Sequence, residues 1–140
     1  MSGAVVNPIV ITDKLSGDVY WQMALDVTEG GVYGSGLGIA LLGVSDIEQC
    51  IRIIMTTLPG TDPLRPTFGL NYLRFLDQPI SLAAPLIVGL TVLALETWEP
   101  RISIVSVVPY STQSSSIGVD ITWAFKGQSA SNTTTVVVGG

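Results

Sequence analysis

Residues 43–69, GVSDIEQCIRIIMTTLPGTDPLRPTFG, describe a helix that runs directly into a proline-rich loop. Ser45 and Glu48 have the spacing of a capping box, which predicts that a helix begins here. Apolar side chains then recur at the three- and four-residue intervals of one helix face: Ile47, Cys50, Ile51, Ile54, Met55 and Leu58. Pro59-Gly60 ends the pattern. The stretch therefore predicts an amphipathic helix with one face on a core.

The loop after this helix contains Pro59, Pro63 and Pro66. Proline fixes φ and biases the residue before it toward extended backbone. We therefore expect a stiff loop that serves as a docking surface rather than as a moving lid. Leucines at 70, 73 and 76 then indicate a short helix.

The segment at about residues 81–97 predicts a second helix that is apolar on nearly every side. One stripe along this helix consists of Leu82, Leu86, Leu90, Leu93 and Thr97. A second stripe consists of Val88, Val92 and Leu95. A helix that is apolar all round is buried all round. A chain of 140 residues can hardly enclose one, so we expect a partner to cover its outer face. The uncharged run 79–95 also raises a membrane alternative, but a span needs about 20 apolar residues and polar or helix-breaking residues interrupt this one.

The remaining apolar runs predict strands. Residues 18–27 alternate between apolar and polar, and 39–42, 101–108 and 119–125 are short apolar or β-branched runs. We therefore expect an α+β fold, in which a small antiparallel sheet from the N-terminal strands plus the C-terminal hairpin packs against two main helices. The expected organisation is an N-terminal arm (1–17), one domain (18–126) and a β-prone C-terminal tail (127–140).

The composition excludes several functions. Charged residues make up only 12% of the chain and hydrophobic residues 47%, so either partners cover much of the surface or the chain meets a membrane. A net charge of −5 argues against nucleic-acid binding. The absence of histidine and the single Cys50 exclude Ser/His/Asp and Cys/His catalysis and offer no zinc cluster. The N-terminus is not typical of a secretory signal. We expect no metal and no cofactor.

The spacing Gly34-x-Gly36-x-Gly38 invites a dinucleotide-binding interpretation. A run typical of a strand follows these glycines, so no helix N-terminus is available for a phosphate. A hairpin turn is the favoured interpretation.

Trp98-Glu99-Pro100-Arg101 marks the end of the second helix. Pro100 stops the helix and directs the chain into a strand. Arg101 can form bidentate hydrogen bonds with a carboxylate, or can bind the last carbonyls of a helix. Glu99 and Arg101 could therefore form an internal pair that stabilises the turn, or could contact a partner protein.

Three ordered motifs carry a family resemblance. They are Asp46-Ile47-x-Gln49 with Ile51-Arg52; Gly60 and Asp62-Pro63 with Arg65-Pro66-x-Phe68-Gly69; and Trp98-Glu99-Pro100-Arg101-Ile102. Together they resemble the baseplate wedge, or sheath-initiator, family of contractile phage tails, which is shared with type VI secretion baseplates and is often labelled lysozyme-like. The likeness covers about residues 18–125. The glycine-rich stretch 30–38 and the tail have no counterpart in it.

The resemblance implies a structural protein of the virion tail baseplate, assembled in the host cytoplasm, with about six copies around a ring. The implied partners are other wedge proteins, the tail sheath protein, and tube or hub proteins, with no nucleic acid and no membrane insertion. It implies that a helical bundle of other wedge proteins packs near the contact residues Trp98, Glu99, Pro100 and Arg101. It also implies that the sheet offers the first sheath ring an edge. We expect the hairpin and the tail to supply that edge through Val119, Ile121, Trp123, Thr133, Val136 and Val138.

Two alternatives belong to other classes. A cell-wall glycosidase needs two carboxylates about 5–9.5 Å apart across a cleft. The candidate pairs, Glu96 with Glu99 and Asp62 with Asp77, are not predicted to lie on opposite walls, so we expect no enzyme and no catalytic residue. A membrane-associated protein built on 79–95 is the second alternative.

Overall fold

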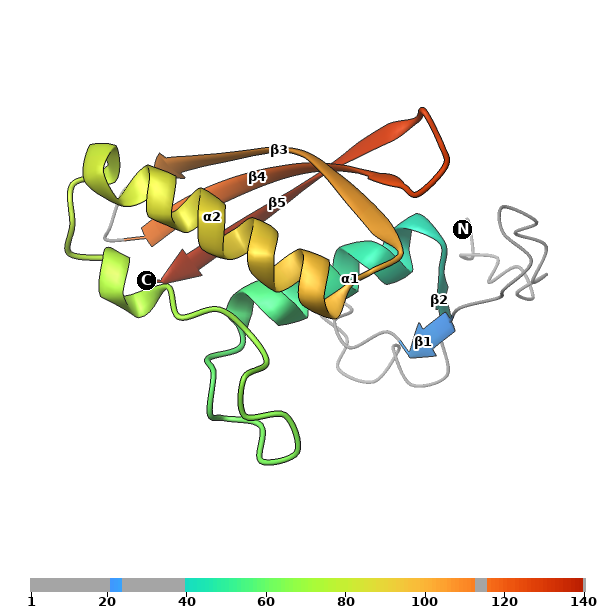
Figure 1. The fold of residues 1–140 in the computed structure, drawn as a ribbon, viewed down its shortest axis with the longest axis horizontal. Coiled ribbons are helices and arrows are strands. Elements are labelled where there is room, and N and C mark those ends of the chain that lie inside the picture. The colour runs from blue at the N-terminus through green and yellow to red at the C-terminus, as the bar shows by residue number, and fades with distance from the viewer. Residues whose placement is uncertain (1–20, 24–39, 113–115, 140) are drawn as a thin grey trace, which may run out of the picture. The chain divides into compact units, whose positions relative to one another are not determined.

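The computed structural model describes residues 21–23, 40–112 and 116–139. Their elements follow in the order β1 (Trp21–Met23), β2 (Ala40–Leu42), α1 (Val44–Thr56), η1 (Leu73–Phe75), α2 (Ile80–Trp98), β3 (Ile102–Ser111), β4 (Ser116–Phe125) and β5 (Ser131–Gly139), and all except η1 are labelled in Figure 1. The chain forms two compact units, residues 1–49 and 50–140, whose boundary lies inside α1. The predicted α+β class is confirmed.

The first unit contains a short antiparallel ladder. Trp21 pairs with Leu42 and Met23 with Ala40. Gly43 follows at φ 58°, a left-handed conformation that suits glycine, and its carbonyl accepts a hydrogen bond of 3.2 Å from the Ile47 N–H. The helix therefore begins at Val44, with Ser45 inside its first turn rather than at the N-cap as predicted. The rest of the strand predicted at 18–27, the arm and the glycine-rich stretch lie outside the described residues.

The second unit is built on a three-stranded antiparallel sheet in the order β3-β4-β5. This arrangement differs from the expected sheet in one respect. The N-terminal strands pair with each other, and the third strand beside the C-terminal hairpin comes from the tail. β-branched residues at 133–138 favour this, because they pack well on a pleated surface. The inward side chains of β4 and β5 are almost fully buried: Ile117, Val119, Ile121 and Trp123 with Thr134, Val136 and Val138.

A buried hydrogen bond joins the two strands within this core. The Trp123 indole Nε1–H donates to Thr134 Oγ1 at 2.9 Å, and both residues are nearly inaccessible to solvent. A buried indole N–H without a partner would cost roughly 1–3 kcal/mol. Thr134 therefore lets the sheet bury its largest side chain at little polar cost.

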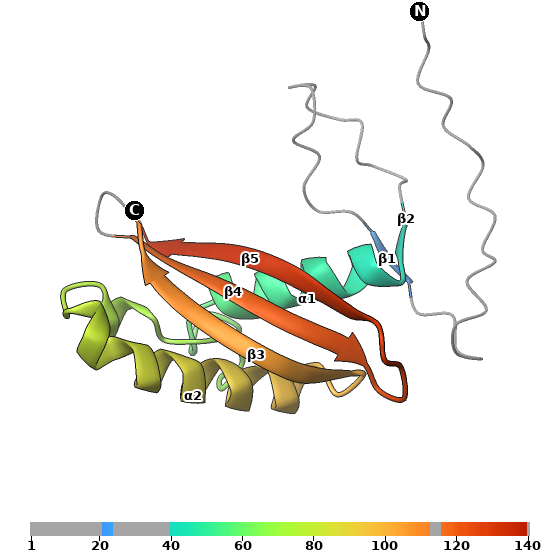
Figure 2. The same ribbon diagram turned by 90° about the horizontal axis from the view of Figure 1, so that it is seen from above.

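Helix α2 packs along β3, as Figure 2 shows from above. Its buried face is made of mostly small residues: Ala83, Ile87, Thr91, Ala94 and Leu95. The chain does not enclose α2 on every side, as expected for its length, because Leu82, Leu86 and Leu93 are 67%, 54% and 62% exposed. These three leucines therefore lie on the outer face of the helix.

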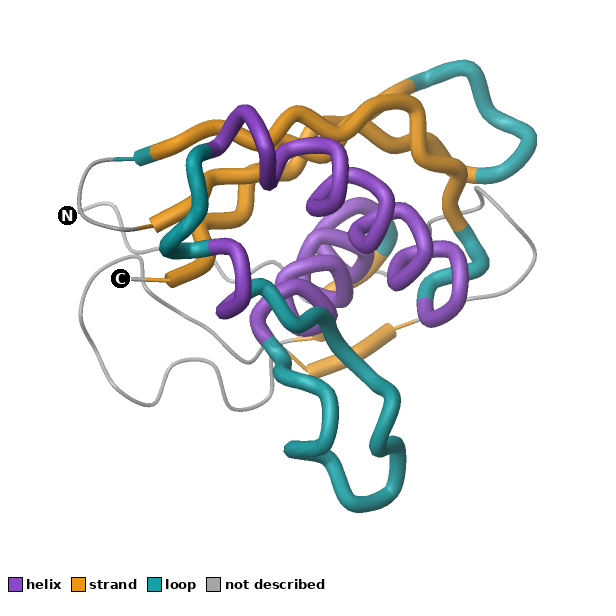
Figure 3. Tube along the Cα trace, turned by 60° about the vertical axis from the view of Figure 1, so that its left-hand side comes forward, coloured by secondary structure: helices purple, strands orange, loops and turns teal. Residues whose placement is uncertain are grey.

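The part of α1 that belongs to the second unit buries Ile51, Ile54 and Met55 completely or nearly so. The predicted apolar stripe is confirmed at these positions. After Thr56 the chain enters the proline-rich loop, and the tube in Figure 3 shows this loop projecting well away from the helices before it returns to η1.

Candidate functional site

The site begins where α2 ends. Glu99 has φ −128° and ψ 73°, outside the helical region, and its N–H donates the last helical hydrogen bond to the Leu95 carbonyl at 2.8 Å. Pro100 has no N–H and cannot continue the helix. Two residues later β3 begins at Ile102. The predicted switch from helix to strand is therefore confirmed.

Glu99 and Arg101 form a bidentate ion pair inside this turn. Arg101 Nε donates to Glu99 Oε1 at 2.6 Å and Nη2 donates to Oε2 at 2.8 Å. Nη2 also lies 3.5 Å from Cys50 Sγ on α1. The Glu99 side chain is 4% exposed, and that of Arg101 is 23% exposed. The internal pair weighed from the sequence is thus present, while Pro100 and part of Arg101 remain at the surface.

An aromatic contact connects this turn to the proline-rich loop. The rings of Trp98 and Phe68 meet edge to face, with centroids 5.2 Å apart and planes at 76°. On the loop side, the Arg65 guanidinium lies 4.3 Å from the centre of the Phe68 ring, within cation–π range. The loop and the turn are therefore held by continuous side-chain packing.

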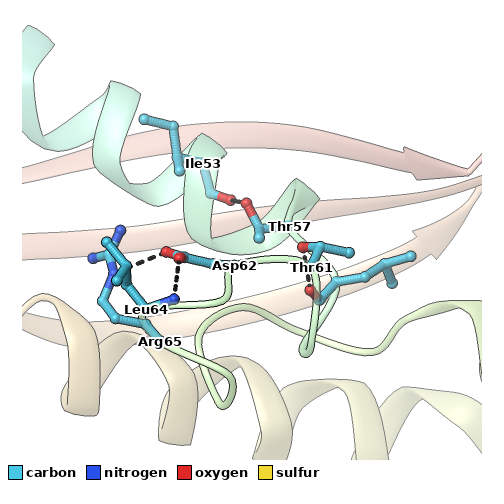
Figure 4. A network of polar contacts seen from close by, with 7 residues as sticks. Ile53, Thr57, Thr61, Asp62, Leu64 and Arg65 are labelled. Atoms are coloured by element: carbon cyan, nitrogen blue, oxygen red, sulfur yellow. Dashed lines mark hydrogen bonds and ion pairs between the residues drawn. The ribbon is translucent and has the colours of Figure 1, made fainter.

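The loop is also hydrogen-bonded within itself, as Figure 4 shows. Asp62 accepts from the Leu64 N–H and from Arg65 Nε, both at 3.0 Å. The Leu64 amide, followed by the Arg65 side chain, lowers the pKa of the Asp62 carboxyl below its usual value. Thr61 Oγ1 donates to the Leu58 carbonyl at 2.6 Å. These bonds add to the backbone restraint that the prolines impose on the loop.

The base of the loop closes by a close backbone approach. The Leu70 N–H donates to the Thr57 carbonyl at 2.9 Å. Gly69 has φ +104°, and a Cβ placed there would lie 2.1 Å from the same Thr57 oxygen. Only glycine fits this position. At the far end, Leu64 is 91% exposed, so the loop presents a large apolar side chain to solvent.

The sheet offers one well-formed edge. Strand β4 pairs with β3 on one side and with β5 on the other, so Val119, Ile121 and Trp123 lie in the central strand with 0% exposure. We correct the expectation that these three residues pair with a partner, because their backbones are already paired and their side chains form the core. Thr133, Val136 and Val138 lie on β5, which pairs only with β4 among the described strands.

The other outer strand is less suited to further pairing. In β3 the register shifts between Ile104 and Ser106, which leaves Val105 as a bulge, and Pro109 cannot donate a ladder hydrogen bond. Helix α2 also packs along this strand. By contrast, β5 pairs continuously from Ser131 to Gly139 and contains no proline.

The carboxylates proposed for a glycosidase do not form a suitable site. Arg101 holds Glu99 in its ion pair, and the pKa of Asp62 is lowered, which is opposite to the raised pKa of a general acid. Glu96 and Asp77 are exposed. Among the described residues, no group of three His, Cys, Asp or Glu side chains could hold a metal ion.

Comparisons with known proteins agree with this geometry. Residues 43–129 match the family described as baseplate wedge protein gp25, and this is more than half of the chain. The chain therefore belongs to the baseplate wedge protein gp25 family. As a member, it is a component of the tail baseplate of a contractile, virion-like particle. No curated protein matches its sequence significantly.

Two solved structures are similar. A protein named as a tail lysozyme from Geobacter sulfurreducens has a TM-score of 0.58 at 27% identity, over 66% of this chain and 86% of its own. A chain in the baseplate of pyocin R2, in its postcontracted state, has a TM-score of 0.51 at 25% identity, over 69% of this chain and 96% of its own. The matched family is one of structural baseplate proteins, although one neighbour has an enzyme's name.

Some surface residues were not predicted from the sequence as exposed features. Leu64 has no periodic pattern that would single it out. The outward leucines of α2 have one, since Leu82, Leu86 and Leu93 recur at the four- and seven-residue intervals of a coiled-coil seam. In the sequence this signal is hidden by the apolar residues on every other side of the helix.

Proposed function

We propose that this chain is a baseplate wedge subunit on which assembly of the tail sheath begins, through addition of a sheath strand to the free edge of β5, the edge that pairs with no other described strand. The continuous, proline-free ladder of β5 is the observation that carries this proposal. An unpaired strand edge presents a row of N–H and C=O groups that a further strand can satisfy. An added strand would place its side chains beside those of β5 on both faces of the sheet. Thr133, Thr135 and Val137 lie on the exposed face, and Val136 and Val138 lie on the buried face.

A second contact is proposed at the helix end, between residues 98–101 and a helical bundle of other wedge proteins. Pro100 is exposed and Arg101 is partly exposed, while Glu99 is buried. The role of Glu99 is therefore to hold the guanidinium in one orientation. A fixed, planar guanidinium suits helix C-terminal carbonyls or a carboxylate of the partner.

The proposed assembly has about six copies around a ring, as the family resemblance implies, with the sheath protein and with tube or hub proteins as further neighbours. It needs no catalysis. The paired Glu99, the lowered pKa of Asp62 and the exposed Glu96 and Asp77 support a protein without cell-wall hydrolase activity. Purified chain should leave cell-wall suspensions turbid.

The edge proposal is tested with Val136→Pro and Val137→Pro in a source that assembles particles. Adjacent strand residues direct their N–H groups to opposite sides, so one substitution removes a bond to β4 and the other removes only a donor at the free edge. The melting temperature of each purified variant identifies which is which. Val137→Thr, which keeps the N–H and the branched side chain, is the control.

The variant that keeps its melting temperature is expected to enter baseplates but to yield particles without sheath. Full-length sheaths on that variant would contradict the proposal. If both variants unfold, amide hydrogen exchange on the unchanged chain gives the answer. Outward amides of β5 should exchange freely in the isolated chain and become protected in the particle, and unchanged exchange would equally contradict it.

A further inference from the structure

The outer face of α2 has the pattern of a helix-packing seam. Five of its exposed residues follow one another at intervals of four, three, four and three: Leu82, Leu86, Gly89, Leu93 and Glu96. Ser81, Pro85 and Thr97 are also exposed. A 3.5-residue repeat of this kind keeps one narrow stripe facing a second helix. From Leu82 to Leu93 it extends about 16 Å at 1.5 Å per residue. We call these five residues the α2 seam.

Gly89 lies in the middle of the seam and is exposed. A Cβ placed there would meet nothing within 4 Å, so the chain's own packing does not require glycine. Glycine in a helix interior is unfavourable relative to other residues. A second helix could approach the backbone closely here, with the flanking leucines on either side of the contact.

The charges of α2 indicate which kind of helix fits. Residues 80–95 contain no charged side chain, and the seam ends at Glu96. The first turn has no acidic residue and the last turn no basic one, so neither end of the helix dipole is compensated by α2 itself. A second helix lying antiparallel would place its positive N-terminal end beside the negative C-terminal end of α2.

We propose that the α2 seam docks an amphipathic helix of another baseplate protein, antiparallel to α2, with apolar residues at heptad spacing and a basic residue opposite Glu96. A crossing angle of about 20° follows from this packing class. The inference rests on the proposed function in one respect, namely that the docked helix comes from another baseplate protein. It concerns a different surface from the β5 edge and from residues 98–101.

A second copy of the chain or a lipid bilayer fits the seam less well. Two antiparallel copies would each place Glu96 opposite the other's first turn, which has no basic residue. By length and composition alone α2 could cross a membrane. One face of the helix is nevertheless buried in the protein, and this face consists of Ala83, Ile87, Thr91, Ala94 and Leu95. Helices that lie on membranes also carry basic residues on their polar face, and α2 has none.

The test uses the full chain in its particle-producing source. A benzoylphenylalanine photocrosslinker is placed at position 86 or 93, with position 129, in the exposed turn before β5, as control. Crosslinks from 86 and 93, but not from 129, should map to one helical segment of another baseplate protein, about two helical turns apart and in antiparallel order. Crosslinks to a second copy, or none to protein at either position, would overturn the proposal.

A substitution provides an independent readout with opposite signs. Gly89→Leu should keep or raise the melting temperature of the isolated chain, because the position is open and leucine favours helix. Gly89→Leu should also lower incorporation of the chain into baseplates at least tenfold, because the new side chain fills the space at position 89 through which the second helix would approach. Ser81→Leu, exposed on the same helix but about 100° from Leu82, should leave both unchanged.

Incorporation of Gly89→Leu at the wild-type level would overturn the seam inference while leaving the proposed function intact. A wild-type chain that is never recovered in baseplates would instead overturn the proposed function. Flotation of purified chain with vesicles of phosphatidylethanolamine and phosphatidylglycerol should show no binding. Binding abolished by Leu86→Glu would assign the seam to lipid and overturn the inference.

Discussion

Phe68 and Trp98 meet edge to face at 5.2 Å, and this contact joins the exposed loop to the turn at which α2 becomes β3. The two residues belong to motifs separated by about thirty positions in the chain. Arg65 extends the contact on one side and the Glu99–Arg101 pair follows on the other. The two family motifs are thereby joined by direct side-chain contacts.

Phe68→Ala should lower the free energy of unfolding by about 3 kcal/mol, because it removes a buried aromatic ring and leaves a cavity beside Trp98. Urea unfolding followed by tryptophan fluorescence measures this loss. Thr67→Ala, at the exposed neighbouring position, is the control and should change the free energy by less than about 0.5 kcal/mol. Equal effects of the two variants would show that the ring contact contributes nothing.

Gly69→Ala and Gly60→Ala separate steric overlap from backbone strain. Both glycines have positive φ, but a Cβ at 69 would overlap the Thr57 carbonyl oxygen whereas a Cβ at 60 meets nothing within 4 Å. We expect a loss of about 1 kcal/mol for Gly60→Ala and at least about 3 kcal/mol for Gly69→Ala. Thermal unfolding of both proteins checks the order, and a smaller loss at 69 would contradict it.

Thr91 and Thr134 are both buried, but only Thr134 has a use for its hydroxyl. Thr91 Oγ1 has no hydrogen-bond partner among the described residues, whereas Thr134 Oγ1 accepts from Trp123 Nε1. Valine is nearly isosteric with threonine. Thr91→Val should therefore stabilise the protein by roughly 1 kcal/mol, and Thr134→Val should destabilise it by roughly 1–3 kcal/mol. Opposite signs in denaturant unfolding are the expected result, and matching signs would refute it.

Removing either member of the Glu99–Arg101 pair should have unequal effects. Arg101→Ala leaves a carboxylate that is 4% exposed without its guanidinium, which costs about 3–5 kcal/mol when a buried pair is broken. Glu99→Gln keeps a side-chain oxygen that can accept a hydrogen bond, and should cost about 1–2 kcal/mol. Chemical unfolding measures both. A larger loss of unfolding free energy for Glu99→Gln than for Arg101→Ala would mean that the buried Glu99 carboxylate does not need the Arg101 guanidinium.

Acid should loosen the loop through Asp62. Its pKa is lowered in the folded chain by the Leu64 amide and the Arg65 side chain. The stabilisation of the folded loop by the Asp62 carboxylate is therefore fully present above the usual pKa of aspartate, and it is lost as the pH falls through the lowered pKa. The Leu64 amide resonance should shift with this transition in an NMR titration, and Asp62→Asn should abolish the shift. A midpoint above the usual aspartate value would contradict the assigned cause.

Several elements were predictable because their causes are local. The helix at 44–56, the turn at 98–101 and the strands at 102–111 and 116–125 follow from apolar periodicity, proline and β-branching. The ion pair was one of two alternatives, since the two residues are only two positions apart. The choice between an internal pair and a partner contact depends on burial, and burial at 99 comes from elements remote in sequence.

The placement of the tail was not predictable in the same way. Residues 133–138 were expected to be β-prone, but whether they pair internally depends on a partner strand at the right distance and register. In the structure β4 lies between β3 and β5, so the tail completes the core and its outer edge pairs with no other described strand. The central position of Val119, Ile121 and Trp123 follows from the same pairing.

The sequence by itself determined roughly where the two main helices and most of the strands lie, which family the chain resembles, and which catalytic chemistries its residues exclude. These follow from short-range patterns and from composition, which need no knowledge of distant contacts. Only the tertiary structure decided which of two apolar faces of α2 is buried and which outer strand of the described sheet has a regular, proline-free edge. Both α2 faces are apolar in sequence, and packing of the smaller one against β3 leaves Leu82, Leu86 and Leu93 in solvent.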